Sequence, residues 1–305
     1  MATPALKIVN SIEPQTEQVG PSLLAGTAMM PVIASPLAGS EEHILSALSN
    51  QSLTNVIMAG FIRDNGFVSP LNRGQFYTCR DEKNRLEGVA LIGHTVLFDA
   101  LSDRAIQAFA GLARRQNSKP HLLMGEHNAV ESFWSYYAQS PESPRLVCPI
   151  LFLQRHKPFD EQPEVCGLRP ATREDLEHVV HAQAAMVLEI SGVDPLKKHP
   201  AGFRERYLRR IDKKRVWVVI ENDRLVFKAD IIADTPHVSY IEGVYVTPEE
   251  RGKGVGRRCF TGLSRLLMAR SKALYLFVET QNARTKSFYF KLGFTVAGQY
   301  DLLYF

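Results

Sequence analysis

The sequence has few cysteines, and none of them stand close together. Its four cysteines among 305 residues are Cys79, Cys148, Cys166 and Cys259, without a C-x-x-C pair. This spacing argues against a zinc site and against a disulfide scaffold, and it favours a reducing compartment. We therefore expect a cytoplasmic protein with no metal centre.

The sequence also lacks a long uninterrupted apolar run. Residues 21–40 carry no charge, but Pro21, Pro31 and Pro36 interrupt their apolar stretch. No run approaches the roughly 20 apolar residues that a membrane-spanning helix requires. We expect residues 1–40 to form a disordered or loosely docked tail, and we predict no membrane association.

Signals for nucleic-acid binding are missing as well, although the charge is uneven. Residues 1–162 hold 13 Lys and Arg against 15 Asp and Glu, and residues 163–305 hold 23 against 17. The net charge of +4 therefore divides into −2 for residues 1–162 and +6 for residues 163–305. The positive charge of the second part suits a polyanionic ligand. Neither zinc-finger spacing nor an alternation of aromatic and basic residues occurs, so we expect no nucleic-acid partner.

What the sequence does contain is the segment Arg-Gly-Lys-Gly-Val-Gly at residues 251–256. It follows an apolar run that ends at Val246 and precedes an amphipathic stretch that starts near Gly254. Glycines let the backbone approach an anion, and the first amides of a helix have no intrahelical partners. The segment predicts a phosphate-binding turn between a strand and a helix.

Two common phosphate loops do not fit this segment. A Walker loop needs G-x-x-x-x-G-K followed by Ser or Thr, whereas Lys253 lies between two glycines with no hydroxyl beside it. A dinucleotide loop needs G-x-G-x-x-G and a parallel, doubly wound sheet. Here the glycines are two apart, and only 26 residues follow Glu279, the candidate ribose ligand.

Periodicity and turn residues predict two similar series of elements on either side of a polar linker at 156–164, which contains two prolines. The first series is helical at 41–67, strands at 74–80 and 86–97, a helix at 103–115 begun by Ser102, a strand at 121–124, a helix at 128–138 and a strand at 146–153. The second has a strand-like start at 165–169, helices at 174–189, capped by Thr172, and 201–211, strands at 215–220, 225–233 and 237–246, a helix at 254–270, a strand at 273–279, a helix at 282–292, and short strands at 295–299 and 302–305. Short connections, including Asn222-Asp223, predict that the three consecutive strands form an antiparallel meander.

Two motifs resemble those of a known family. Arg251, Gly254 and Gly256 match the pattern Arg/Gln-x-x-Gly-x-Gly/Ala. The second motif starts at Asn282 and ends in Tyr289-x-x-x-Gly293-Phe294. In this order, and separated by one helix and one strand, they make residues 165–305 resemble the GNAT (GCN5-related) N-acetyltransferases.

The resemblance implies an α/β (α+β) fold of two GNAT-like domains, each a mixed, mainly antiparallel sheet flanked by helices. Residues 41–155 repeat the series of elements, but Phe98-Asp99-Ala100-Leu101 stands where the glycine loop would be. The chain thus resembles a tandem subfamily, with a degenerate domain at 41–155, a linker at 156–164 and a catalytic domain at 165–305. The first domain would complete the acceptor cleft or the domain packing without binding a second coenzyme.

The co-substrate that the resemblance implies is acetyl-CoA, with no metal. The loop amides would take its pyrophosphate, with charge added by neighbouring side chains that include Arg258, and the strand before the loop would lie beside the pantetheine arm. The coenzyme-binding residues implied are Val244, Tyr245, Val246, Arg251, Gly252, Lys253, Gly254, Val255, Gly256, Arg257, Asn282 and Tyr289. Gly243, inside that strand, indicates either a bulge or a simple packing requirement.

The reaction implied is transfer of an acetyl group to an amine by direct attack on the thioester. Tyr289 would be the general acid for the departing thiolate. Glu242 is the candidate base, because strand alternation puts it on the face of Tyr240 and Val244; the alternative is a solvated glutamate on an edge strand. Tyr240 and His237 are weaker candidates, and the N–H of Tyr245 or Val246 would hold the oxyanion.

A second function class stays open, a non-catalytic acyl-CoA-binding sensor or scaffold. The acceptor is equally open between a small molecule and a protein lysine or N-terminus, because residues 192–200 carry no recognisable specificity signature. Monomer and homodimer are both compatible with the sequence.

Overall fold

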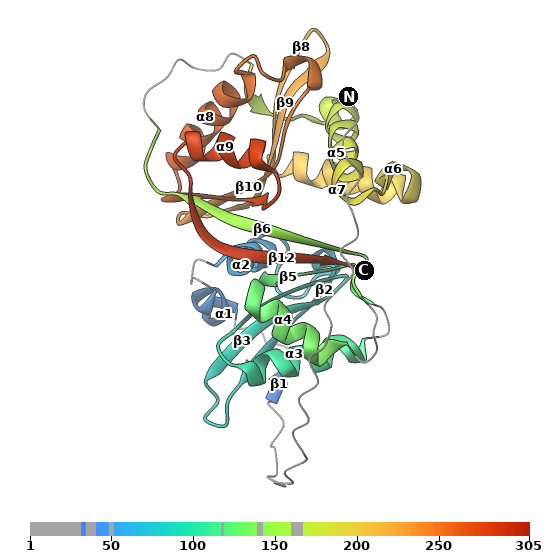
Figure 1. The fold of residues 1–305 in the computed structure, drawn as a ribbon, viewed down its shortest axis with the longest axis vertical. Coiled ribbons are helices and arrows are strands. Elements are labelled where there is room, and N and C mark those ends of the chain that lie inside the picture. The colour runs from blue at the N-terminus through green and yellow to red at the C-terminus, as the bar shows by residue number, and fades with distance from the viewer. Residues whose placement is uncertain (1–31, 35–40, 49–51, 117–118, 139–142, 160–166) are drawn as a thin grey trace. The chain divides into compact units, whose positions relative to one another are not determined.

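The computed structural model describes residues 32–34, 41–48, 52–116, 119–138, 143–159 and 167–305 (Figure 1). Most of the predicted tail at 1–40, and the part of the predicted linker from 160 to 164, lie outside the described residues. Contacts divide the chain into the units Met1–Met30 and Pro31–Phe305, so that all described residues belong to the second unit.

From residue 41 on, the elements of the first half follow the predicted order, and a short strand at 32–34, inside the predicted tail, was not predicted. The elements are β1 (Val32–Ala34), α1 (Glu41–Ala47), α2 (Leu53–Asn65), β2 (Gly74–Arg80), β3 (Leu86–Gly93), β4 (Thr95–Ala100), α3 (Asp103–Arg115), β5 (Leu122–Glu126), α4 (His127–Tyr137) and β6 (Leu146–Arg155). The strand predicted at 86–97 is in fact two strands, because the chain reverses at Gly93 and His94. A Cβ on Gly93 would lie 2.4 Å from the Cα of its cross-strand partner Gly74, so the close approach of β2 and β3 at this point requires glycine.

The second half also follows the predicted order, with two differences. Its elements are β7 (Arg169–Pro170), α5 (Leu176–Ser191), α6 (Pro195–Lys198), α7 (Pro200–Asp212), β8 (Val216–Glu221), β9 (Arg224–Asp234), β10 (Val238–Val246), α8 (Val255–Met268), β11 (Ala273–Glu279), α9 (Ala283–Lys291) and β12 (Thr295–Tyr304). The short helix α6 was not predicted. The two short strands predicted after residue 295 are the single strand β12, which contains a register shift between Val296 and Gly298.

The twelve strands of the described residues join one sheet in the order β1-β2-β3-β4-β5-β12-β6-β11-β10-β9-β8-β7. The pairs β4–β5 and β10–β11 are parallel and the others antiparallel, which confirms the mixed, mainly antiparallel class. The meander β8–β9–β10 is confirmed, and its first turn uses positive φ at Asn222 and Asp223.

The two halves exchange their last strands. β6, from the first half, pairs with β11 of the second, with Phe152 opposite Phe277. β12, from the end of the chain, pairs with β5 of the first half, with Leu302 opposite Met124. The two exchanged strands also pair with each other, so they run side by side in the middle of the sheet (Figure 1). Neither half completes its sheet alone.

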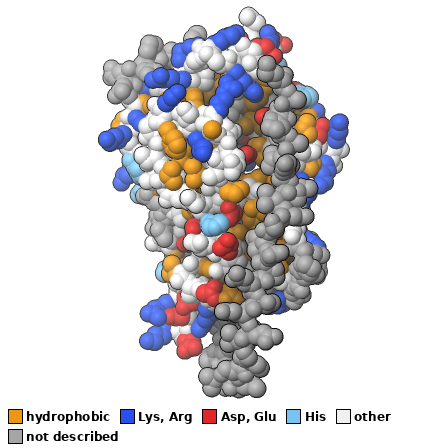
Figure 2. All heavy atoms as spheres, in the orientation of Figure 1, with side chains coloured by type: hydrophobic (Ala, Val, Ile, Leu, Met, Phe, Trp, Pro, Cys, Tyr) orange, Lys and Arg blue, Asp and Glu red, His pale blue; other side chains and the backbone are white. Residues whose placement is uncertain are grey.

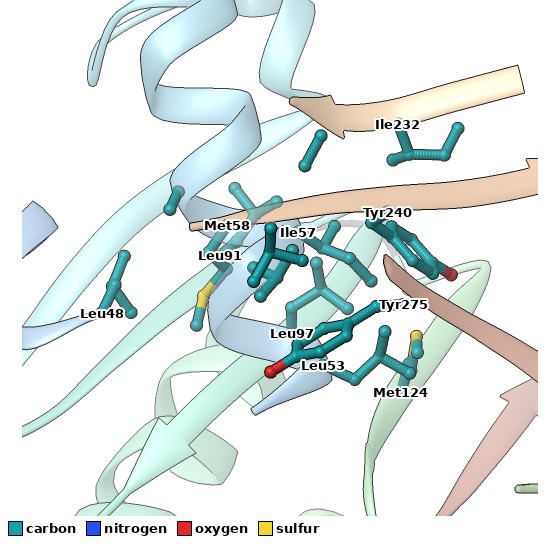
Figure 3. Close-up of a cluster of buried hydrophobic side chains, with 14 of the residues drawn as sticks. Leu48, Leu53, Ile57, Met58, Leu91, Leu97, Met124, Ile232, Tyr240 and Tyr275 are labelled. Carbon is teal, nitrogen blue, oxygen red and sulfur yellow. The ribbon is translucent and has the colours of Figure 1, made fainter. Parts of the chain in front are cut away.

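The largest core cluster likewise draws on both halves (Figure 3). Ile57 and Met58 of α2 pack in one cluster with Ile232, Tyr240 and Tyr275 of the second half. The approach is close, since a Cβ on Gly60 of α2 would lie 2.9 Å from the Cβ of Ala233 on β9. The helix α2 therefore covers part of the second half's sheet.

A different cluster fills the opposite side of β9 and β10. It joins Phe227 and Ile231 of β9 and Ile241 of β10 to residues of α8 and α9. The sheet of the second half thus has one face covered by α8 and α9, and another that contacts α2 and α5. No helix in the described part of the chain is long and apolar enough to cross a membrane.

Candidate active site

The glycine segment forms a turn that leads into α8. Gly252 and Gly254 have φ of 82° and 79°, in the left-handed region that favours glycine. Gly254 is the N-cap of α8, and no side chain caps this helix end. The first amides of α8 are therefore free of a capping side chain, as an anion site at a helix N-terminus requires.

Basic side chains surround this turn. Arg251, Lys253, Arg257 and Arg258 are all exposed, and Lys and Arg side chains gather over α8 in Figure 2. Three of the four already have partners, because Arg251 Nε donates to the Val246 carbonyl at 2.9 Å, Lys253 Nζ lies 3.1 Å from Glu250, and Arg258 donates to the Lys253 carbonyl at 3.3 Å. The predicted loop residues do come together, and part of their charge ties the loop to β10.

Gly256 has a packing role of its own. A Cβ at this position would lie 3.1 Å from Cγ2 of Val246, closer than most real contacts. Glycine here lets the first turn of α8 lie directly against the end of β10.

β10 separates from its neighbour β11 at the point where the site begins. It pairs with β11 only from Val238 to Tyr240, although both strands continue. Its pairing with β9 shifts between Glu242 and Tyr245, where two residues of β10 face one of β9. This is a β-bulge, and Gly243 within it has φ of 58°.

The bulge reverses the alternation of side chains along β10. Ile241, Val244 and Val246 all pack on the cluster below α8 and α9. Glu242 instead lies with Tyr240, whose hydroxyl donates to its carboxylate. The prediction that Glu242 shares a face with Val244 was wrong, because the extra residue shifts the period-two pattern by one position.

Glu242 is not a solvated edge residue. Its strand lies between β9 and β11, and burial raises the pKa of its carboxyl above the usual range. The Tyr240 hydroxyl and the charge of Arg210 oppose this rise. Of the weaker candidates, Tyr240 is fully buried with its hydroxyl committed to Glu242, and His237 is exposed in the turn before β10.

Tyr289 lies on the other face, within the cluster of α8 and α9. Its side chain is 6% exposed, and its ring centroid lies 5.4 Å from that of Phe260 and 5.7 Å from that of Phe294. Burial raises the pKa of its phenol, so the neutral form that can donate a proton is favoured. Asn282, the other motif residue, caps α9 by accepting from the Thr285 N–H at 3.0 Å.

The bulge thus places the two candidate groups on opposite faces of the sheet. Glu242 faces the side of α5 and α7, and Tyr289 the side of α8 and α9. The parted end of β10 lies between them. A thioester bound there would have a carboxylate on one side and a phenol on the other.

Sequence reasoning missed a buried polar group beside Glu242. Lys228 and Asp230 of β9 are buried, and their partners are Gln183 of α5 and Arg210 of α7. The signal was present, because two charged residues stand in the apolar run Val226–Ala233 with the spacing of one strand face.

The part of the first half that the structure describes contains no comparable site. The helix after β4 is capped, because the Ser102 hydroxyl accepts from the Ala105 N–H. Phe133 follows the α4 N-cap Glu126 by the same seven residues that separate Tyr289 from Asn282, and Phe133 has no hydroxyl. Its ring stacks on Phe98 at 5.0 Å. Among the described residues, no group of three or more His, Cys, Asp or Glu could hold a metal ion.

Comparisons with known proteins agree with this geometry. Residues 185–294 match the profile of the Acetyltransferase (GNAT) family. A GNAT-family acetyltransferase from Colwellia psychrerythraea aligns at a TM-score of 0.52 and 14% identity, over 90% of this chain and 99% of that one. A tandem GNAT protein from the clavulanic acid biosynthesis pathway aligns at 0.55 and 14%, over 90% and 98%. A Drosophila protein aligns at 0.63 and 11%, over 90% and 99%. No curated protein matches the chain.

The profile match makes residues 185–294 similar to the GNAT family, and the solved structures show that the chain shares its fold. The similarity in fold to a tandem GNAT protein extends over 90% of the chain, so it includes the amino-terminal half.

Proposed function

We propose that the protein transfers an acetyl group from acetyl-CoA to an amine. The observation that carries this proposal is the parted end of β10, with an uncapped helix beyond it and an ionisable group on each face. The division into a degenerate domain at 41–155, a linker at 156–164 and a catalytic domain at 165–305 is part of the same proposal, as is a cytoplasmic location.

The chain's own groups suit the coenzyme. The amides at Gly254–Gly256 and the exposed Arg257 and Arg258 would hold the pyrophosphate. The backbone at Val244–Val246, which has no strand partner on the β11 side, would pair with the amides of the pantetheine arm. The thioester would then lie near Glu242 and Tyr289, between the parted strands.

The reaction then needs two proton transfers. Glu242 would accept a proton from the attacking amine, and its raised pKa makes the carboxylate a stronger base at neutral pH. As the C–S bond breaks, the departing thiolate would take the phenol proton of Tyr289. The proton gained by Glu242 leaves to solvent, and Tyr289 is reprotonated from solvent, so the cycle balances.

A coenzyme-binding sensor is the second candidate. The observation in its favour is the setting of Tyr289, which is also that of an ordinary core tyrosine, surrounded by phenylalanine rings. In that case the loop would bind coenzyme without turnover.

Measurement of thiol release from acetyl-CoA with a panel of small amines and lysine peptides separates the two. We expect acceptor-dependent release that falls about 100-fold in Tyr289→Phe, as is usual for loss of a general acid. Tyr275→Phe, at another buried tyrosine, is the matched control and should keep its rate. Tight coenzyme binding with no acceptor-dependent release would sink the enzyme proposal.

A further inference from the structure

Lys228 is a fully buried lysine in the middle of β9. Its side chain is 0% exposed, and burying an ammonium without partners is strongly unfavourable. A lysine therefore persists here only if its three N–H donors are used.

Three elements supply acceptors for this ammonium. Nζ lies 2.7 Å from Gln183 Oε1 of α5, 2.9 Å from Asp230 Oδ1 of β9 and 3.3 Å from the Gly243 carbonyl of β10. Arg210 of α7 pairs with the other oxygen of Asp230 at 3.3 Å. The ammonium thus connects a helix and a neighbouring strand to the bulge.

Gly243 lies against this group, and a side chain at this position would require the neighbouring side chains to move. A Cβ at this position would lie 2.9 Å from Lys228 Nζ and 2.9 Å from Asp230 Oδ2, and its φ of 58° disfavours a side chain in any case. The sequence left two explanations for this glycine, and the structure shows that both apply: a bulge, and close packing of a lysine.

The contact with the carbonyl has a directional consequence. The peptide bond between Gly243 and Val244 is trans, so its C=O and its N–H point in opposite directions. Lys228 Nζ lies on the face of the sheet that α5 and α7 cover, against Gln183 and the ring of Tyr207. A carbonyl held toward Nζ therefore turns the Val244 N–H away from that face, at the point where β11 has parted from β10.

We propose that Lys228 is a positioning residue, which locks the Gly243 peptide so that the Val244 N–H is aimed at the thioester carbonyl between β10 and β11. This inference rests on the proposed function and refines it, since it moves the oxyanion donor from Tyr245 or Val246 to Val244. A fixed donor stabilises the oxyanion without reorganising during the reaction.

The test removes the donors and keeps the aliphatic stem. Lys228→Met should lower kcat about 100-fold, in line with the loss of one oxyanion donor. The dissociation constant of acetyl-CoA should stay within about twofold, because the loop at 251–256 is untouched. Lys213→Met is the matched control and should keep its kcat. Lys213 Nζ also donates to a backbone carbonyl, that of Asp64, at 2.7 Å.

Two further measurements separate positioning from general loss of structure. Lys228→Met leaves Asp230 with Arg210 as its partner, so the variant should stay folded, and its urea unfolding curve measures the stability that it loses. In amide NMR spectra of the wild type, acetyl-CoA should shift the Val244 resonance more than CoA without the acetyl group, and Lys228→Met should lose that difference.

The amide measurement does not depend on turnover, so the two proposals fail separately. Absence of turnover with a Val244 shift that Lys228→Met removes would reject the enzyme and keep the positioning role. An unchanged Val244 shift in Lys228→Met, or a kcat within twofold of wild type, would overturn the positioning role alone.

Discussion

At the scale of single residues, Gly254 serves both backbone conformation and ligand approach. Its φ of 79° disfavours a side chain, and a Cβ would lie 3.3 Å from an Arg258 guanidinium nitrogen. We expect Gly254→Val to raise the coenzyme dissociation constant at least about tenfold, since the backbone could no longer approach the pyrophosphate. Titration calorimetry with CoA measures this.

A control separates ligand approach from backbone strain. Gly66 also has positive φ, 78°, with open space around it, and it caps α2 far along the sequence from the loop. Gly66→Val should lose stability without losing coenzyme affinity. Equal CoA affinity in Gly254→Val and wild type would show that the loop is not the phosphate site.

Glu242 sets the expected pH dependence. A general base must be deprotonated, and burial raises the pKa of this carboxyl above its usual 4.5. The rate kcat/KM should therefore fall as pH drops through this raised pKa, at a higher pH than for an exposed glutamate. Glu242→Gln should be slow at every pH and should lose this fall of kcat/KM at low pH. Glu205→Gln, on the exposed side of α7, should keep the fall. A fall that persists in Glu242→Gln would assign the titration to another group.

At the scale of elements, the contact between α2 and β9 links the halves. Gly60 brings α2 onto Ala233, and Arg215 of the second half pairs with Asp64 of the first at 2.8 Å. Gly60→Val adds bulk at a site with no room, and we expect it to lower the free energy of unfolding by about 1–3 kcal/mol. Urea titration provides the measurement.

The matched control is Gly111→Val, inside α3. There the nearest atom to an added Cβ is a guanidinium nitrogen of Arg115 at 3.5 Å, an ordinary contact with a flexible side chain. Both variants place valine in a helix, so the difference between them reports the α2–β9 contact. Equal free energies of unfolding for the two variants would mean that α2 can move away from β9 without loss of stability.

Most of the elements could be predicted from the sequence because their signals are local. Ser102 begins α3 and Asn222-Asp223 turns β8 into β9, as their side chains and backbone preferences predict. The face of Val244 was not predictable, because it depends on a bulge held by Lys228 and Gln183 from other elements. A strand period says nothing of an inserted residue.

At the scale of the whole molecule, the exchanged strands make the halves interdependent. Without β12 the first half leaves β5 unpaired on one side, and without β6 the second leaves β11 unpaired. Exposed edges of this kind promote aggregation. We expect fragments 1–159 and 167–305 to be insoluble when expressed alone and to purify together when co-expressed.

Affinity capture of one tagged fragment measures this, and the uncut chain is the reference. Coenzyme binding should return only in the pair. Soluble, monomeric fragment 167–305 with wild-type CoA affinity would contradict the prediction.

The exchange itself could not be predicted from the sequence. The apolar patterns of β6 and β12 are compatible with pairing inside their own half and with pairing across the halves. In the structure the two strands pair with each other, with Leu146 opposite Tyr304. Periodicity identifies a strand and the face it buries, whereas the choice between two similar partners depends on the packing of the complete chain.

The position of β12 also has a consequence in time. During synthesis the amino-terminal half leaves the ribosome long before residues 295–304 exist, so its sheet waits for the final strand with β5 uncovered. β6 waits as well, between partners that are both still to be made. We therefore expect the protein to reach its native state only after residues 295–304 have emerged, and slowly, as is usual for topologies dominated by distant pairings.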